Sequence, residues 1–235
     1  MTRRDFQESL EALRSDVVDM GELVLGRVDD ALHALDSGDA GSGARVIDGD
    51  DEINDLSLDR ESTCIDRFAL QQPVAGDLRF VAASFKILTD LERIGDLATN
   101  LAGYARDADT RYLPDLDLAH VGRLARDLVA DAIEAYATDD AGACREIAAR
   151  DDEIDALCHA ASEQVVRDLI QRRAAAGPES GAGDGGATPW DVEAVLDDVS
   201  RGLLTVRDLE RIADHGVNVA ARTLYAVDSD PELIY

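Results

Sequence analysis

The sequence predicts an all-α protein made of two repeated three-helix bundles, six helices in total. The first observation is an internal repeat: Asp-Leu-Glu-Arg-Ile-Gly-Asp at residues 90–96 returns at 208–214 with one change, Gly to Ala. A second pair of similar segments, Asp-Asp-Glu-Ile-Asn at 50–54 and Asp-Asp-Glu-Ile-Asp at 151–155, lies upstream of each copy. The third observation is helical apolar periodicity along nearly the whole chain, without the alternation that marks strands.

The first three helices are expected at about residues 5–36, 43–71 and 76–107. Glycines at positions 38, 41 and 43 mark the first turn. Pro73 ends the second helix, because proline disfavours a helical conformation in the residue before it. The third helix has apolar residues at alternating spacings of four and three, as in bundles and coiled coils. These are Ile87, Leu91, Ile94, Ala98, Leu101 and Ala105.

The last three helices are expected at about residues 117–138, 141–173 and 189–226. Pro114 separates the halves, which gives a first unit at residues 1–112 and a second at 113–235. The last helix begins with Pro189 after Thr188, a favourable N-cap residue. The Gly-rich segment 174–187 has no apolar periodicity and is typical of a flexible loop. It accounts for the longer spacing between the two motifs of the second copy.

Composition points to a salt-adapted protein. Fifty acidic residues against 23 basic ones give a net charge of −27, and Lys86 is the only lysine. At molar salt the Debye length falls to about 3 Å, so the mutual repulsion of such a surface is screened. We interpret the charge as adaptation to the salt-rich cytosol of a halophile; a surface for basic partners is the alternative. Nucleic-acid binding is not expected, since it needs a basic footprint.

The three cysteines, Cys64, Cys144 and Cys158, form no CxxC pair and no even set. They fit a reducing compartment better than a disulfide framework. The N-terminus lacks the apolar core of a signal peptide, and no run approaches the roughly 20 apolar residues of a membrane span. A cytoplasmic protein without direct membrane insertion is therefore expected.

Each copy carries an acidic row, with side chains four residues apart on one helix face. The first acidic row is Glu92, Asp96 and Asn100, and the second acidic row is Glu210, Asp214 and Asn218. The apolar positions of the first row's helix lie on the opposite face, so this row is expected on the outside of its bundle. Outward acids avoid the cost of several kcal/mol that burying an unpaired carboxylate carries.

Oxygen ligands at this spacing suit divalent or trivalent metal ions such as Mg, Mn or Fe, and Zn is a further candidate. Asp50 and Asn54 on a neighbouring helix are expected to complete the first site, and Asp151 and Asp155 the second. The alternative is that all these acids belong to a salt-adapted surface and bind no metal.

An enzyme is not expected, and no catalytic residue or organic cofactor is assigned. The sequence has no phosphate-binding GxxxxGK[ST] loop, no GxSxG nucleophile elbow and no Glu-x-x-His metal motif. Two other classes stay open. One is a carboxylate-bridged metalloenzyme, a hydrolase or oxidase that uses the same acids, and the other is a helical scaffold without metal.

Three segments, residues 46–54, 70–79 and 91–96, resemble the PhoU family of phosphate-uptake regulators. The resemblance runs nearly end to end and implies two similar three-helix bundles. It also implies metal binding through an acidic E(D)-x-x-x-D motif. The motif maps onto Asp50 with Asn54, Glu92 with Asp96, Asp151 with Asp155, and Glu210 with Asp214. The family's Gln-Gln-Pro-Val-Ala stretch is kept in the first half only.

The same resemblance implies a cytosolic accessory of the high-affinity phosphate ABC transporter that restrains uptake when phosphate is plentiful. The partners it implies are the transporter's ATP-binding subunit and a signalling protein, in bacteria a phosphate-sensing histidine kinase. A homodimer is expected from small-residue helix faces, which pack closely.

Overall fold

The computed structural model describes residues 3–37, 40–49, 75–107, 117–175 and 189–233, and this part of the chain is helical with short turns. Its helices are α1 (Arg3–Ser37), α2 (Ala40–Asp48), α4 (Ala75–Asp107), α5 (Leu118–Thr138), α6 (Ala141–Ala175) and α7 (Pro189–Asp228). The all-α prediction is confirmed, and the helix limits agree within a few residues. The predicted second helix is described only at its start, since residues 50–74 lie outside the described residues.

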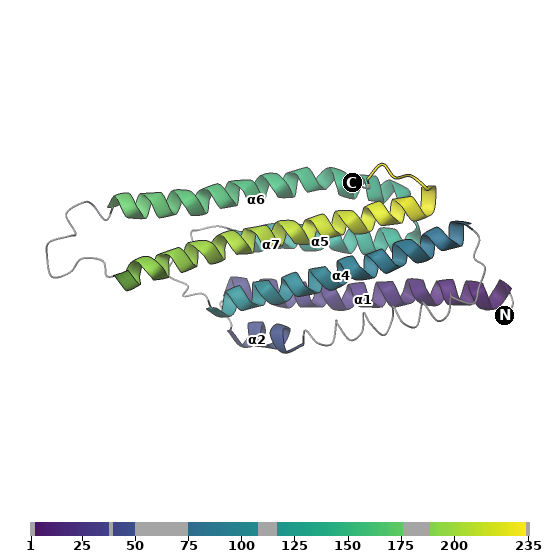
Figure 1. Cartoon of the computed structure of the whole chain (residues 1–235), viewed down its shortest axis with the longest axis horizontal. Coiled ribbons are helices and arrows are strands. Elements are labelled where there is room, and N and C mark those ends of the chain that lie inside the picture. Colours follow the sequence, from purple (N-terminus) through teal and green to yellow (C-terminus); the bar gives the residue numbers. More distant parts are fainter. Residues whose placement is uncertain (1–2, 38–39, 50–74, 108–116, 176–188, 234–235) are drawn as a thin grey trace.

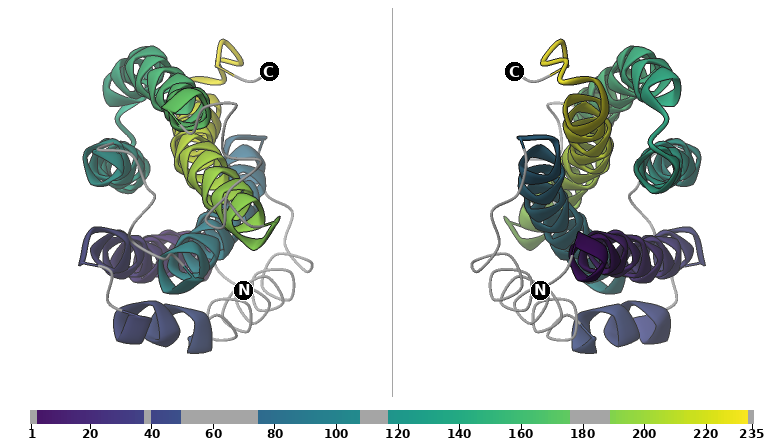
Figure 2. Two further views of the ribbon diagram at one scale, coloured as in Figure 1. Left: turned by 90° about the vertical axis from the view of Figure 1, so that its left-hand side faces the viewer. Right: turned by 90° about the vertical axis from the view of Figure 1, so that its right-hand side faces the viewer.

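The helices lie side by side along one long axis (Figure 1). α1, α2 and α4 pack together as the first unit, and α5, α6 and α7 as the second. The two units also pack against each other, α1 on α5 and α4 on α7. The end-on views show α4 and α7 crossing through the middle, with α2 and α6 at opposite ends of the section (Figure 2). The repeated bundles therefore form one elongated body.

One continuous apolar core joins the two units. All six apolar positions predicted on the third helix are buried, at 0–5% exposure. All but Ala105 belong to a cluster that includes residues of every described helix. Aliphatic and alanine side chains make up most of it, which allows helices to approach closely. Gly122 on α5 shows this approach: a Cβ there would lie 2.2 Å from Leu32 of α1. The core follows from the periodicity read in the sequence.

The α4–α7 interface has approximate two-fold symmetry. Asp90 on α4 and Asp208 on α7 hold equivalent positions in the repeat, and both are 3% exposed. Asp90 accepts a hydrogen bond from Nε of Arg222, and its Oδ1 lies 3.0 Å from Nδ1 of His215. Asp208 accepts from the Tyr104 hydroxyl at 3.1 Å. Tyr104 and Arg222 also occupy equivalent positions in the two repeats. The same contact therefore occurs twice at this interface, with a tyrosine as the donor to Asp208 and an arginine as the donor to Asp90.

Arg14 of α1, in the first unit, forms hydrogen bonds with the end of α5 in the second unit. Its guanidinium donates to the backbone carbonyl of Tyr136 and to both carboxylate oxygens of Asp139, at 2.9 and 2.8 Å. It also lies 4.8 Å from the centre of the Phe80 ring, within cation–π range. Asp139 ends α5 in the left-handed conformation, with φ of 55°. This contact fixes the end of α5 before the chain turns into α6. Among the described helices, none is long and apolar enough to cross a membrane.

Candidate metal centre on α6 and α7

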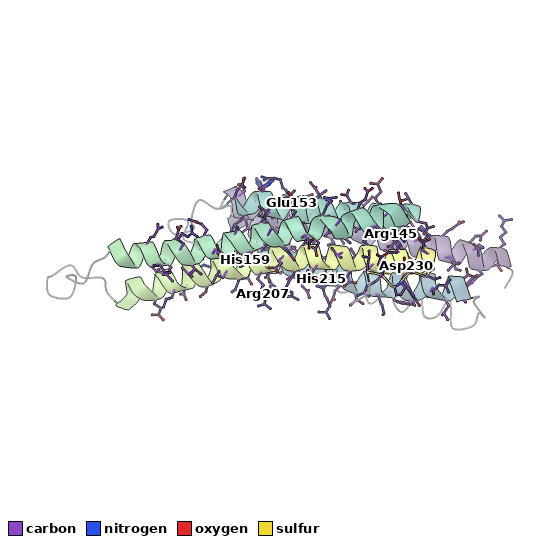
Figure 3. The ribbon with its side chains drawn as sticks, turned by 90° about the horizontal axis from the view of Figure 1, so that it is seen from above. Arg145, Glu153, His159, Arg207, His215 and Asp230 are labelled. Atoms are coloured by element: carbon purple, nitrogen blue, oxygen red, sulfur yellow. The ribbon has the colours of Figure 1, made fainter. Side chains whose placement is uncertain are left out.

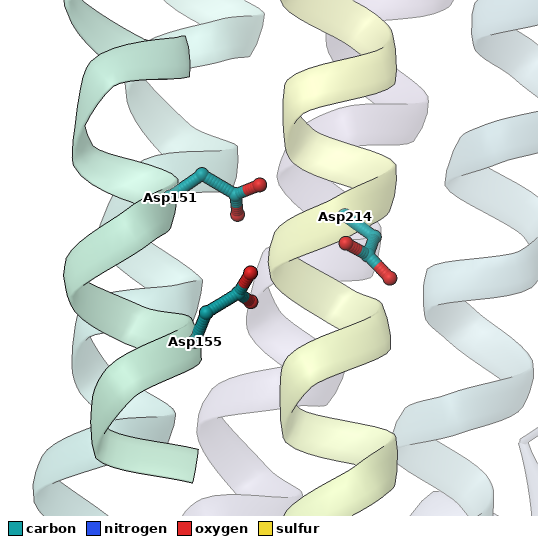
Figure 4. A group of neighbouring side chains, drawn as sticks. All are labelled: Asp151, Asp155 and Asp214. Atoms are coloured by element: carbon teal, nitrogen blue, oxygen red, sulfur yellow. The ribbon is translucent and has the colours of Figure 1, made fainter. Parts of the chain in front are cut away.

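Three carboxylates converge between α6 and α7. Asp151 and Asp155, one turn apart on α6, face Asp214 on α7 (Figure 4). One oxygen from each lies within 4.8 Å of the others, a spacing that a single bound cation can bridge. We call Asp151, Asp155 and Asp214 the aspartate cluster.

The helix register explains why these side chains meet. Ile154 on α6 and Ala213 on α7 are buried in the apolar core, at 3% and 0% exposure. Each lies next to an aspartate in the sequence, so the neighbouring aspartates point to the rim of the helix pair. Asp155 and Asp214 are exposed and Asp151 is half-buried. The cluster is thus open to solvent on one side.

Crowding of like charges disfavours ionisation in the cluster. Burial and the neighbouring carboxylates raise the pKa of Asp151 from 3.8 to about 6, the largest share coming from burial and the next from Asp155. Burial and the Asp155 charge also raise the pKa of Asp214. The pKa of Glu210 rises for the same two reasons. A bound cation would relieve this repulsion and hold the acids ionised.

One oxygen of the cluster has no hydrogen-bond partner. Oδ1 of Asp151 is buried and makes no hydrogen bond within the described part of the chain. A buried carboxylate oxygen without a donor is costly unless a cation or a hydrogen bond satisfies it. The residues present therefore fit a hard cation bound through oxygen ligands.

Cys158 lies beneath the cluster, one turn further along α6 from Asp155. It is fully buried, and burial together with the charges of Glu210 and Asp155 raises its pKa to about 12. The thiol is therefore protonated at neutral pH and is not a ready metal ligand. The sequence analysis did not connect Cys158 with the acids, although its place seven residues after Asp151 is a signal for one helix face.

The other predicted ligands do not belong to the group of three carboxylates that converge between α6 and α7. Glu210 lies one turn before Asp214 and interacts electrostatically with the cluster, while Asn218 is exposed one turn beyond it. In the first acidic row, Glu92 is half-buried and Asp96 and Asn100 are exposed, which agrees with the outward face expected for this row. The remaining predicted ligands, Asp50 and Asn54, lie outside the described residues.

Comparison with known proteins gives relatives over almost the full chain. The protein is 30% identical over 230 residues to the phosphate-specific transport system accessory protein PhoU homolog of Pseudomonas putida, covering 95% of this chain and 81% of the relative. The homolog from Clostridium acetobutylicum is 27% identical, covering 97% and 96% of the two chains.

Solved structures show the same fold. The crystal structure of PhoU from Pseudomonas aeruginosa superposes with a TM-score of 0.83 at 30% identity, covering 96% of this chain and all of that one. The phosphate transport system regulatory protein PhoU from Streptococcus pneumoniae gives 0.81 at 26% identity, over 96% and 98%. The PhoU domain model matches twice, at residues 17–105 and 118–223. The chain belongs to the PhoU family.

Proposed function

We propose that this protein is a regulatory accessory of phosphate transport that restrains uptake when phosphate is plentiful. The match to relatives named as phosphate-specific transport system accessory proteins, over 95% or more of this chain, is the observation that carries this proposal. The proposed role is regulatory rather than catalytic. The acids with raised pKa values sit on an open rim between two helices, where a regulator can present them to a partner.

The proposed partner is the ATP-binding subunit of a phosphate ABC transporter, with a phosphate-responsive signalling protein as a second partner. Both contacts require the protein in the cytoplasm, where the ATP-binding subunit lies. The elongated helical body supports this role, since it offers long exposed helix faces to a partner (Figure 1). In the salt-rich, halophilic cytosol that we propose from the acidic charge, screening would limit the electrostatic repulsion between this surface and an acidic partner.

The aspartate cluster is proposed to bind one divalent or trivalent metal ion. Three carboxylates and solvent would supply oxygen ligands, which favours Mg, Mn or Fe over Zn. Glu210 and Asn218 extend the same rim. The equivalent first site would use Glu92, Asp96 and Asn100 together with Asp50 and Asn54. A bound ion would lock α6 against α7 and add positive charge to a rim that is otherwise repulsive.

Uptake of labelled phosphate tests the regulatory role. Cells without the protein are expected to keep taking up phosphate at high external phosphate, and the wild-type gene should restore restraint. A variant with Asp151→Asn, Asp155→Asn and Asp214→Asn should restore it less well if metal shapes the docking face. Uptake that responds normally to external phosphate in the deletion strain would overturn the proposed function.

Homodimerisation is part of the proposal and does not depend on the metal. A dimer would present two copies of each docking face, which raises the effective affinity for an assembly with two matching subunits. Equilibrium sedimentation in molar KCl measures it directly, and a chain that stays monomeric there would contradict it.

A further inference from the structure

The paired helices α6 and α7 extend beyond the rest of the described structure. α5 has 21 residues, whereas α6 has 35 and α7 has 40, and α5 joins α6 through a short turn. The last part of α6 and the first part of α7 therefore run past the ends of α4 and α5 (Figures 1 and 3). We call residues 162–175 of α6 and 189–204 of α7 the arm.

Exposed apolar side chains concentrate on this arm. Among the described residues, seven large hydrophobic side chains are exposed, and four of them belong to the arm. They are Val166 at 43%, Ile170 at 61%, Leu196 at 52% and Leu204 at 37%. Val166 and Ile170 are one turn apart on α6, and Leu196 and Leu204 are two turns apart on α7. In a chain so rich in acids, this gathering of apolar surface indicates a contact face.

Both helices begin this face with an acid that is followed by apolar residues. On α6, Glu163, Val166 and Ile170 follow at intervals of three and four, which places them on one side of the helix. On α7, Glu193, Leu196, Ser200, Leu204 and Arg207 follow at intervals of three, four, four and three. Each stripe therefore begins with an acid and continues with two apolar residues, and the α7 stripe ends with an arginine.

The α7 stripe is complementary to a reversed copy of itself, and the apolar pair of α6 is symmetric in the same way. On α6, Val166 and Ile170 lie equally far from residue 168. On α7, Glu193 and Arg207 lie equally far from Ser200, the midpoint between Leu196 and Leu204. An antiparallel copy would thus set apolar against apolar on both helices, and acid against base at both ends of the α7 stripe.

The two midpoints lie at the same level of the arm. Asp155 of α6 faces Asp214 of α7, and the helices are antiparallel, so a residue near 168 of α6 lies opposite a residue near 200 of α7. One two-fold axis perpendicular to the arm can therefore satisfy both stripes. Both stripes lie on the side of the helix pair that carries the aspartate cluster. Val166 follows Asp155 by about three whole turns of α6, and Leu196 precedes Asp214 by five whole turns of α7, so each pair of residues shares one helix face.

We propose that the arm is the homodimer interface, where two copies pair antiparallel into a four-helix bundle about one two-fold axis. This assignment rests on the homodimer within the proposed function and gives it a surface. An isologous contact needs a self-complementary patch, which the palindromic stripes supply. The axis would place the two aspartate clusters at opposite ends of the paired arms, facing opposite sides of the assembly.

Sedimentation equilibrium of the full chain in molar KCl tests the surface. The wild type should form dimers, and Ile170→Asp with Leu196→Asp should raise the dimer dissociation constant at least about tenfold. Leu78→Asp with Val227→Asp is the matched control, since both residues are exposed apolar side chains outside the arm, and it should leave dimerisation unchanged. Circular dichroism confirms that each variant keeps its helices.

A charge exchange tests the antiparallel geometry, at the lowest KCl concentration that still permits wild-type dimers. Glu193→Arg alone should weaken the dimer, and adding Arg207→Glu should restore it, because each residue would face the other across the axis. A dimer that resists the arm substitutions, or a control that dissociates equally, would overturn this surface but leave phosphate regulation standing. A wild type that stays monomeric would overturn the homodimer and, with it, the arm as a surface for a second copy of this chain.

Discussion

α4 and α7 hold equivalent places in the two repeats, and the difference between them lies in their partners. Each buries an aspartate at the interface between the units, Asp90 or Asp208, and each carries an acidic row on its outer side. Asp90 meets Arg222 and His215, whereas Asp208 meets the hydroxyl of Tyr104. Duplication kept the acids and changed what they contact.

The two contacts differ in electrostatic compensation. Arg222 supplies a permanent positive charge to Asp90, while Tyr104 supplies a neutral hydroxyl to Asp208. Burial and the Asp208 charge raise the pKa of Tyr104, so this hydroxyl stays protonated and keeps donating. A buried carboxylate is stable when a cation and hydrogen bonds compensate it. The Asp90 contact should therefore stabilise the α4–α7 interface more than its counterpart.

The largest expected effect on stability comes from removing the charge of Asp90, which compensates the charge of Arg222. Asp90→Asn should lower the free energy of unfolding by about 3 kcal/mol, because it leaves the Arg222 guanidinium partly buried without its anion. Asp208→Asn should change the free energy of unfolding by less than about 1 kcal/mol, since an amide can still accept from Tyr104. Urea denaturation in molar KCl measures both. Equal losses in the free energy of unfolding for the two variants would show that Asp90 and Asp208 stabilise this interface equally.

A smaller effect is expected at Tyr104. Tyr104→Phe removes the hydroxyl that Asp208 accepts from and leaves that 3%-exposed carboxylate without its described partner. The free energy of unfolding should fall by about 1–2 kcal/mol. The same denaturation experiment measures it, and Tyr104→Phe combined with Asp208→Asn should recover part of the loss. A double variant no more stable than Tyr104→Phe would mean that the two groups are not coupled.

The smallest expected change in stability has the opposite sign. Without metal, Asp151→Asn should stabilise the fold by about 1 kcal/mol, after allowance for solvent screening of this half-exposed group. The pKa of Asp151 in the folded state, about 6, exceeds the ordinary aspartate pKa of 3.8, so the folded state binds more protons between these two pH values. Stability of the metal-free chain should therefore fall as pH rises from about 4 to about 6.

Melting temperatures across this pH range check that prediction, and the Asp151→Asn variant serves as the control with a flatter profile. Metal should reverse the trend, because cation binding needs ionised carboxylates and strengthens as pH rises through the pKa of Asp151. A metal-free wild type whose stability rises between about pH 4 and about pH 6 would contradict the claim that burial and neighbouring carboxylates raise the pKa of Asp151.

Much of the fold could be predicted from the sequence because periodicity and chain breakers act locally. Ile87, Leu91 and Ile94 mark one buried face of α4, and Pro189 marks the start of α7. The outward phase of the first acidic row followed from that same buried face. The convergence of Asp151 and Asp155 with Asp214 also followed, because it needs only two adjacent helices and a repeat.

Other features depend on how helices far apart in sequence meet, and periodicity does not encode this. The pairing of Asp90 with Arg222 requires the antiparallel register of α4 against α7. The length of the arm depends on α5 being short relative to its neighbours, a comparison that gains meaning only when the helices are packed.

Metal content is the most direct test of the central claim, that the second copy's acids bind a metal. Elemental analysis of protein purified in molar KCl should find bound metal, and Asp151→Asn/Asp155→Asn/Asp214→Asn should lower the metal content by about one ion per chain. Glu92→Gln/Asp96→Asn, the matched change on α4, should leave the ion at the aspartate cluster in place. A metal content that the first variant does not lower while its helices stay intact, or a wild type without metal after incubation with Mg, Mn and Fe, would contradict the account.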